Sequence, residues 1–307
     1  MKAQLLVMAI ASFAIGSLLG QVSASQDTGG SNPGRGSWVF LQDDPDQSLV
    51  RLSADESSLT TIASSAAGAG LAMDLNGDYI VAARKALLRV TRSGKVNQIA
   101  AAPGGSSWTR VGVTARGEFI AADGVKPVLW RISPDGRSVE MVASYRELEC
   151  DQPGSEIQLA LAVDPSGEYL LLFEGAAHLA RASETVVHFL RVRPDGSVAR
   201  VPLTGIKLKW PAGMTPDGHD GYLVVDPTNP TGVLRLSLDG NVSLADPGVP
   251  GRLVGPWAVA ASAQTGGVMT ADGLDGLIAI GRSDSQPLEP FKVHLTRPTA
   301  VVWDGKR

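Results

Sequence analysis

The sequence contains a single cysteine, Cys150, among its 307 residues, which excludes an internal disulfide. Stability must therefore come from an apolar core, and a chain of this length is long enough to build one. Cys150 is followed by the turn-forming segment Asp-Gln-Pro-Gly-Ser-Glu, so we interpret it as a loop residue rather than as a nucleophile.

Other absences narrow the class of protein. Lys and Arg number 27 against 31 Asp and Glu, so the chain lacks the dense basic face that nucleic-acid binding requires. The four histidines show no His-x-His or Glu-x-x-His spacing, which argues against zinc. The chain also lacks a Gly-rich phosphate loop and, beyond its N-terminal region, any stretch with the period of an amphipathic helix. These absences favour an all-β protein that does not bind nucleic acid.

The N-terminal region has the features of a signal peptide. One lysine precedes an apolar run, and Val22-Ser23-Ala24 fits the small-x-small pattern of a cleavage site. We therefore expect a signal peptide over residues 1–24, a flexible Gly/Ser/Asn-rich leader over 25–37, and export to the periplasm or the exterior with no membrane span after cleavage. The alternative is an uncleaved anchor, because residues 5–19 form a run that is nearly long enough to cross a membrane.

Turn-forming glycine is abundant, and it recurs with a period. Turns followed by apolar runs repeat at intervals of 39 to 51 residues, centred on Gly77, Gly117, Gly167, Gly218, Gly266 and Gly305. A period near 45 residues with a strand on either side of each turn is typical of a propeller or another repeat array.

A second series of turns follows the first and gives the same period. Each is preceded by a segment that reads apolar-Arg-apolar, an alternation typical of strands. The arginines are Arg51, Arg89, Arg131, Arg191 and Arg235, with Ala279 in the sixth repeat. We expect these arginines to hydrogen-bond nearby carboxylates or carbonyls. Four antiparallel strands per repeat and six repeats predict an all-β fold, a six-bladed β-propeller of four-stranded antiparallel blades over residues 38–307.

The two ends of this region complement each other. The last segment, "RPTAVVWDGKR", has a first strand and its turn, whereas the segment from Trp38 has the other three strands and no first one. We therefore expect residues 299–303 to join the blade that holds Trp38 and so close the ring, which removes two open sheet edges.

The segments "LALAVDPSGEYLLLF", "WPAGMTPDGHDGYLVVD" and "VLRLSLDGNV" resemble the NHL / SMP-30-gluconolactonase-like propellers, and within that group they are most similar to streptogramin B lyase-type propellers. The resemblance covers residues 38–307 and implies the propeller fold. It also implies either a divalent cation held by Glu, Asn and Asp, as in the lactonases, or histidines at the start of each blade's first strand, as in the lyases. None of the matching positions here is His, and the early Glu of the lactonases has no counterpart.

Candidate ligand-binding residues gather where the first strands begin. Trp108, Trp210 and Trp257 lie eight or nine residues before a turn glycine, and Arg110 points the same way as Trp108 if the strand alternates regularly. We expect a small-molecule site with an aromatic mouth; the alternative is that each Trp packs between blades. Further polar candidates come from the long loop of the fourth repeat, with Glu174 and His178 as candidate catalytic groups and Arg181 as a candidate ligand contact.

Carboxylates recur near the ends of the second strands, and they are candidate ligands for Ca²⁺ or Mg²⁺. They are Asp43, Asp123, Asp226 and Asp272, with Glu174 in the fourth repeat. The alternative is that they cap turns or pair with the arginines. We predict a monomeric, non-catalytic propeller that binds a small molecule or a protein at the channel mouth. The alternative is a lactonase-type hydrolase or a lyase with a divalent metal on the same face.

Overall fold

β-strands, all but one of them paired antiparallel, make up the regular structure of the part of the chain that the computed structural model describes. The described residues are 36–53, 57–126, 128–144, 159–176, 185–229, 233–245, 256–262, 267–273, 278–282, 286–290 and 293–305, and for 174–176, 185–186, 256, 278–282 and 286–290 only the backbone is described. All of them belong to one compact unit, Pro33–Arg307. The expected signal peptide, most of the leader, Cys150, His178 and Arg181 lie outside the described residues. Within those ranges, no helix has the length and apolar character of a membrane span.

The described strands form six sheets, numbered here in chain order. Sheet 1 contains β1 (Ser37–Gln42), β2 (Leu49–Leu52), β3 (Leu59–Ala63) and, from the far end of the chain, β25 (Pro298–Asp304). Sheet 2 contains β4 (Gly70–Met73), β5 (Tyr79–Ala82), β6 (Ala86–Val90) and β7 (Val96–Ala101). Sheet 3 contains β8 (Trp108–Val113), β9 (Phe119–Asp123), β10 (Leu129–Ile132) and β11 (Val139–Ala143).

The remaining sheets repeat this order. Sheet 4 contains β12 (Leu159–Val163), β13 (Tyr169–Ala176), β14 (Thr185–Val192) and β15 (Val198–Val201). Sheet 5 contains β17 (Gly213–Pro216), β18 (Gly221–Val225), β19 (Leu234–Ser237) and β20 (Asn241–Leu244), with the short parallel strand β16 (Thr204–Gly205) added at its edge. Sheet 6 contains β21 (Pro256–Ala261), β22 (Gly267–Asp272), β23 (Ile278–Arg282) and β24 (Gln286–Pro290).

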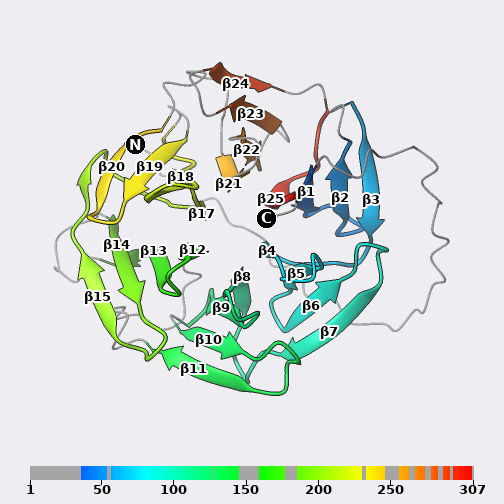
Figure 1. Ribbon diagram of the computed structural model, residues 1–307, viewed down its shortest axis with the longest axis horizontal. Coiled ribbons are helices and arrows are strands. Elements are labelled where there is room, and N and C mark those ends of the chain that lie inside the picture. The colour runs from blue at the N-terminus through cyan, green and yellow to red at the C-terminus, as the bar shows by residue number, and fades with distance from the viewer. Residues whose placement is uncertain are drawn as a thin grey trace, which may run out of the picture. The chain divides into compact units, whose positions relative to one another are not determined.

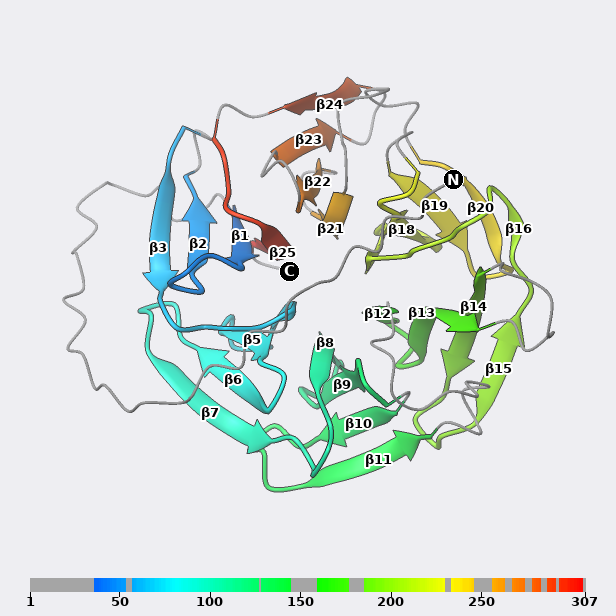
Figure 2. The same cartoon turned by 180° about the vertical axis from the view of Figure 1, so that it is seen from behind.

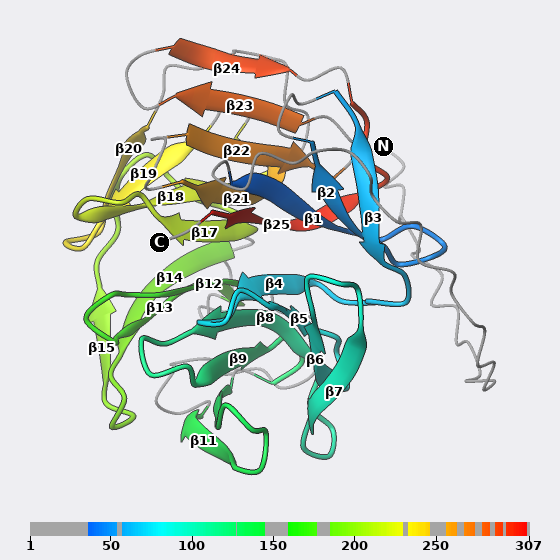
Figure 3. The same ribbon diagram turned by 45° about the vertical axis from the view of Figure 1, so that its right-hand side comes forward.

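The sheets are arranged around a centre, as in a propeller (Figure 1). The first strand of each repeat is innermost and the fourth lies on the outside, and the view from behind shows the same order (Figure 2). Sheet 6 shows this layering in side view, from β21 through β22 and β23 to β24 (Figure 3). The inner strands β25, β4, β8, β12, β17 and β21 therefore surround the centre.

Sheet 1 joins the two ends of the described chain. Strand β25 pairs antiparallel with β1, with Trp38 opposite Trp303 and Phe40 opposite Val301. The indoles of Trp38 and Trp303 lie with their centroids 4.7 Å apart. The predicted pairing of residues 299–303 with the strand that holds Trp38 is present in the structure.

The core is divided into clusters between neighbouring sheets. On β1, Val39 and Leu41 pack toward sheet 2, whereas Trp38 and Phe40 pack toward sheet 6. Such alternation buries both faces of a strand because each sheet has a neighbour on either side. Similar clusters lie between each of the other pairs of consecutive sheets. Apolar residues thus hold every described sheet against two others.

In sheets 2 to 5, the second series of turn glycines brings each sheet against the one before it. Gly136, in the turn after β10, has φ +73°, and a side-chain carbon there would lie 2.0 Å from the carbonyl oxygen of Ile99 on β7. Gly240, in the turn after β19, has φ +89°, and the corresponding distance to the Pro202 carbonyl oxygen is 2.1 Å. Only glycine permits both the backbone conformation and the close approach. The turns therefore rest directly on the outer part of the preceding sheet.

The arginines of the third strands pair with carboxylates, as the sequence predicts. The pairs are Arg51–Asp304, Arg89–Asp74, Arg131–Glu140, Arg191–Glu168 and Arg235–Asp217. At two of these positions, a tyrosine from the next sheet donates a hydrogen bond to a carboxylate near the arginine. Tyr79 donates a hydrogen bond of 2.5 Å to Asp304, and Tyr222 donates one to Asp164. Burial and the bond to Asp304 raise the pKa of Tyr79 to about 12, so its phenol stays protonated at neutral pH.

Two of the carboxylates in these contacts, Asp164 and Asp217, should make the stability of the protein depend on pH. Burial alone would raise the pKa of Asp164 and of Asp217, but hydrogen bonds from Ser166 and Tyr222 to the former, and from backbone N–H groups and Arg235 to the latter, lower both. A pKa lowered on folding stabilises the protein above the unfolded value, near 4, and this contribution disappears as the pH falls further. We expect the urea midpoint to be flat from pH 7 to 5 and to fall below about pH 4.

The pair Asp164→Asn and Asp217→Asn tests this assignment. The double variant should be less stable than the parent at pH 7, and this deficit should shrink as the pH falls below about 4, because the carboxylates then take up protons in the unfolded parent. Asp46→Asn is the matched control, because Asp46 is exposed on the surface. A double variant whose deficit stays constant from pH 7 to pH 3 would show that these carboxylates do not cause the acid transition.

Candidate functional site

A cavity of about 330 Å³ lies at the centre of the sheets. Residues from the six inner strands line it, and most are Ala, Val, Leu, Met or Gly. Among the described lining residues, Arg110 is the only charged one, and Thr215 and Thr299 contribute the hydroxyl groups. The described wall of this cavity, which we call the channel, is thus apolar apart from Arg110 and the two threonines.

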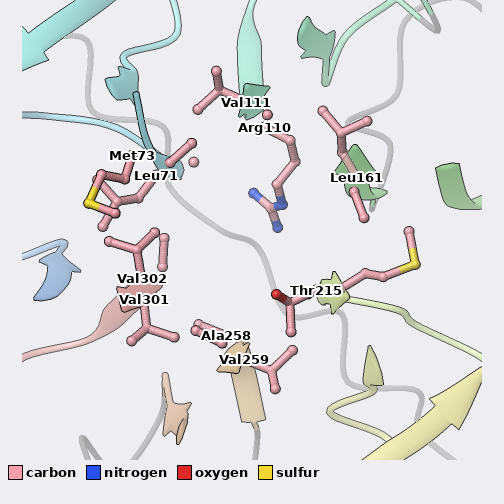
Figure 4. A pocket seen from close by; sticks show the side chains of 18 of the residues that line it. Leu71, Met73, Arg110, Val111, Leu161, Thr215, Ala258, Val259, Val301 and Val302 are labelled. Carbon is pink, nitrogen blue, oxygen red and sulfur yellow. The ribbon is translucent and has the colours of Figure 1, made fainter. Parts of the chain in front are cut away.

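Arg110 points into this cavity from β8 (Figure 4). Its Nη1 donates to the carbonyl oxygens of Ala69 (3.0 Å) and Thr109 (2.9 Å), and its Nη2 donates to that of Ala212 (2.9 Å). Ala69 precedes β4 and Ala212 precedes β17, so the guanidinium reaches two other sheets at the starts of their inner strands. Arg110 therefore crosses the end of the channel at which the inner strands begin.

The charge of Arg110 has no acidic partner among the described residues. Its hydrogen bonds go to carbonyl oxygens, and no Asp or Glu is found among the described residues that line the cavity. Burial lowers the pKa of Arg110 to about 10, because the charged form loses its hydration. At neutral pH the group remains a cation, and none of the described residues that line the cavity carries a charge that compensates it.

A β-bulge explains how Arg110 reaches the channel. The pairing of β8 with β9 shifts between Trp108, which lies opposite Asp123, and Arg110, which lies opposite Ala122. The extra residue, Thr109, breaks the regular alternation. Trp108 consequently enters the cluster between sheets 2 and 3, where it is fully buried, and Arg110 enters the cavity. The expectation that Trp108 lies at the channel mouth and binds ligand is wrong.

Trp257 and Trp210 lie near each other, with ring centroids 6.4 Å apart and an angle of 52° between the planes. Trp257 lines the cavity and is half-buried, whereas Trp210 precedes β17 and is 39% exposed. In β21 the pairing shifts between Pro256 and Ala258, so Trp257 occupies the bulge, as Thr109 does in β8. Trp108 and Trp257 therefore do not share one position in the repeat.

Most of the candidate metal ligands already have other contacts. Asp123 accepts hydrogen bonds from the backbone N–H groups of Ser107, Val125 and Lys126. Asp226 accepts from those of Lys209, Trp210 and Thr228. Both are fully buried and cap the loops that flank them, which is the alternative stated from the sequence.

The other carboxylate candidates do not complete a ring of ligands. Asp43 is half exposed and pairs with Arg297 at 3.3 Å, and Asp272 is buried. In sheet 1, the neighbouring Gln42 takes the capping role, since its side chain accepts from the N–H of Thr296 at 2.6 Å. Among the described residues, no group of three or more His, Cys, Asp or Glu has an arrangement suited to a metal ion. Glu174 lies on β13 opposite Val187, and its side chain is outside the described part.

Comparison with known proteins supports the fold. No family model and no curated protein matches the chain. A crystal structure of a nidogen/laminin complex matches with a TM-score of 0.63 at 16% identity, over 88% of this chain and 98% of the other. A streptogramin B lyase structure matches with a TM-score of 0.54 at 11% identity, over 84% and 74%. Virginiamycin B lyase from Staphylococcus aureus matches with a TM-score of 0.55 at 12% identity, over 87% and 77%. These similarities establish an all-β fold of propeller type.

Proposed function

We propose that the protein is an exported, monomeric, six-bladed propeller of the NHL / SMP-30-like group, closed by β25, which binds a small molecule in its central channel without transforming it. The observation that carries this proposal is the cavity of about 330 Å³ with the side chain of Arg110 inside it. Small-molecule sites are concave, mostly apolar and supplied with a few polar groups, and volumes of about 300–1000 Å³ are usual for them. The channel meets each of these conditions.

The two tryptophans give this site an aromatic mouth. Trp257 lines the cavity, and the exposed Trp210 lies beside it at the start of the neighbouring inner strand. Indole faces bind flat apolar rings well. A ligand with a planar ring therefore has a place to stack at the end of the channel where Arg110 also lies.

A lyase or lactonase is the second candidate, because two of the similar structures are streptogramin-type lyases. That reading would require catalytic groups such as Glu174 and His178, with Arg181 nearby, and a Ca²⁺ or Mg²⁺ ion. The hydrogen bonds of Asp123 and Asp226 to backbone N–H groups favour a capping role for those two carboxylates. Metal analysis of the purified protein separates the candidates, since a stoichiometric divalent ion would favour the enzyme.

The binding proposal predicts the behaviour of a channel variant. A library of flat aromatic fragments, screened by thermal shift, should yield ligands whose affinity falls about tenfold or more in Trp257→Ala, because the stacking surface is lost. Trp130→Phe is the control, since Trp130 lies on β10 away from the channel and packs in the cluster between sheets 2 and 3. A library without a ligand that is sensitive to Trp257→Ala would contradict channel binding.

A further inference from the structure

Resting on the proposed function, we infer that the channel selects organic monoanions, small molecules with an apolar, planar body and one carboxylate or equivalent group that binds Arg110. Three features of the described residues lead to this class: the position of the charge, the absence of a counter-charge, and the nature of the remaining wall.

The position of the charge comes first. The bulge at Thr109 directs Arg110 into the cavity, and the hydrogen bonds to Ala69, Thr109 and Ala212 hold the guanidinium there. A guanidinium has five N–H donors, and these bonds engage three of them. Donors therefore remain for a ligand, in a fixed orientation suited to a carboxylate.

The absence of a counter-charge comes second. The arginines of the third strands pair with Asp or Glu, whereas the hydrogen bonds of Arg110, which lies on an inner strand, go to neutral carbonyl groups. An uncompensated buried charge is unfavourable, and a ligand anion relieves that cost while forming charge-assisted hydrogen bonds. A cationic ligand would meet repulsion from Arg110 and no carboxylate on the described wall.

The wall sets the remaining properties of the ligand. One positive charge among apolar residues matches one negative charge, so nucleotides and other polyphosphates fit poorly. Sugars also fit poorly, because apart from Arg110 the described polar side chains of the wall are few, chiefly Thr215 and Thr299. An aromatic acid satisfies the apolar wall, the indole of Trp257 and the guanidinium together.

A matched set of probes tests this inference on the unmodified protein. The probes are 2-naphthoate, its neutral analogue 2-naphthamide and the cation 2-naphthylmethylammonium, with binding measured by quenching of tryptophan fluorescence and by calorimetry. We expect 2-naphthoate to bind at least about tenfold more tightly than 2-naphthamide, as one charge-assisted contact allows, and the cation to bind more weakly than either.

Variants of Arg110 identify the group responsible. In Arg110→Met, which keeps the length and removes the charge, the preference for 2-naphthoate over 2-naphthamide should disappear, and in Arg110→Lys part of it should remain. Because Met removes an uncompensated buried charge, we expect the melting temperature of the ligand-free variant to be equal to or above that of the parent. Arg137→Met is the control for charge, since Arg137 is 87% exposed on the surface, and it should change nothing.

The outcomes separate this inference from the proposal on which it rests. If 2-naphthamide binds in a manner sensitive to Trp257→Ala but 2-naphthoate binds no better, the channel is a binding site and the anion preference is wrong. Failure of 2-naphthoate to bind also overturns the inference, whatever the fragment library gives. A large fall in the melting temperature of Arg110→Met, together with equal affinity for the probes in the parent, would make Arg110 a structural brace only.

Discussion

Removal of residues 296–307 is expected to prevent folding. These residues include β25, which pairs along the length of β1 and contributes Val301 and Trp303 to the cluster between sheets 6 and 1. They also include Asp304, which accepts hydrogen bonds from Tyr79 and Arg51. The truncated chain would have an unpaired inner edge at β1 and an exposed apolar face on sheet 6, which are conditions for aggregation. We expect aggregated or unfolded protein by size-exclusion chromatography and circular dichroism.

The control is a chain that lacks only residues 306–307, which keeps β25 and Asp304 and should melt within a few degrees of the full chain. An intermediate variant, Asp304→Ala, removes the acceptor of the hydrogen bonds from Tyr79 and Arg51 and should cost about 1–3 kcal/mol. If the chain without residues 296–307 melts like the full-length protein, β25 is not part of the folded core and the closed ring must be abandoned.

Asp226→Ala should give the second-largest effect. Asp226 is fully buried, and its carboxylate accepts hydrogen bonds from the N–H groups of Lys209, Trp210 and Thr228 and from the Thr228 hydroxyl. Alanine would leave these donors without acceptors, at about 1–3 kcal/mol each where water cannot replace the carboxylate. We expect a loss of about 3–4 kcal/mol in the free energy of unfolding, measured by urea denaturation.

Asp43→Ala is the matched control, because the same sequence pattern proposed both residues as metal ligands. Asp43 is 47% exposed and pairs with Arg297 on the surface, so its loss should cost less than about 1 kcal/mol. Asp226→Ala should also alter the emission of Trp210, whose backbone it anchors. Equal losses for the two variants, or stabilisation of the parent but not of Asp226→Ala by Ca²⁺ or Mg²⁺, would contradict the capping role.

The fold was predictable because its signals are local and repeated. Each turn glycine and each apolar-Arg-apolar segment reports a strand boundary by itself, and errors in one repeat are corrected by the others. The match between residues 299–303 and the segment from Trp38 needed only the count of strands at the two ends. The arginine pairs could be predicted for the same reason. The apolar-Arg-apolar segment recurs in the repeats, and a buried or half-buried guanidinium in a strand needs a hydrogen-bond acceptor.

The candidate site was less predictable because it depends on irregularities of one residue. Without the bulge at Thr109, regular alternation places Trp108 and Arg110 on one face; with it, Trp108 is buried and Arg110 alone enters the channel. A one-residue offset also explains why Asp43 does not cap a loop as Asp123 and Asp226 do. In sheet 1 the capping contact is made by the preceding residue, Gln42, which accepts from the N–H of Thr296. Carbonyl groups such as that of Ala212, which orient Arg110, leave no signal in a sequence.

The turn glycines divide the joints between sheets into two kinds. In four cases the backbone of a turn contacts the backbone of the preceding sheet, namely sheet 1, 2, 3 or 4. The turn glycines at these contacts are Gly94, Gly136, Gly196 and Gly240. The corresponding stretches of sheets 6 and 1, residues 282–286 and 53–57, contain no glycine, so no turn glycine is available to make such a contact on either side of sheet 6. Under a pulling force, the ring of sheets should therefore open first beside sheet 6. In hydrogen exchange, the amide protons of β21 to β24 should exchange before those of β8 to β11.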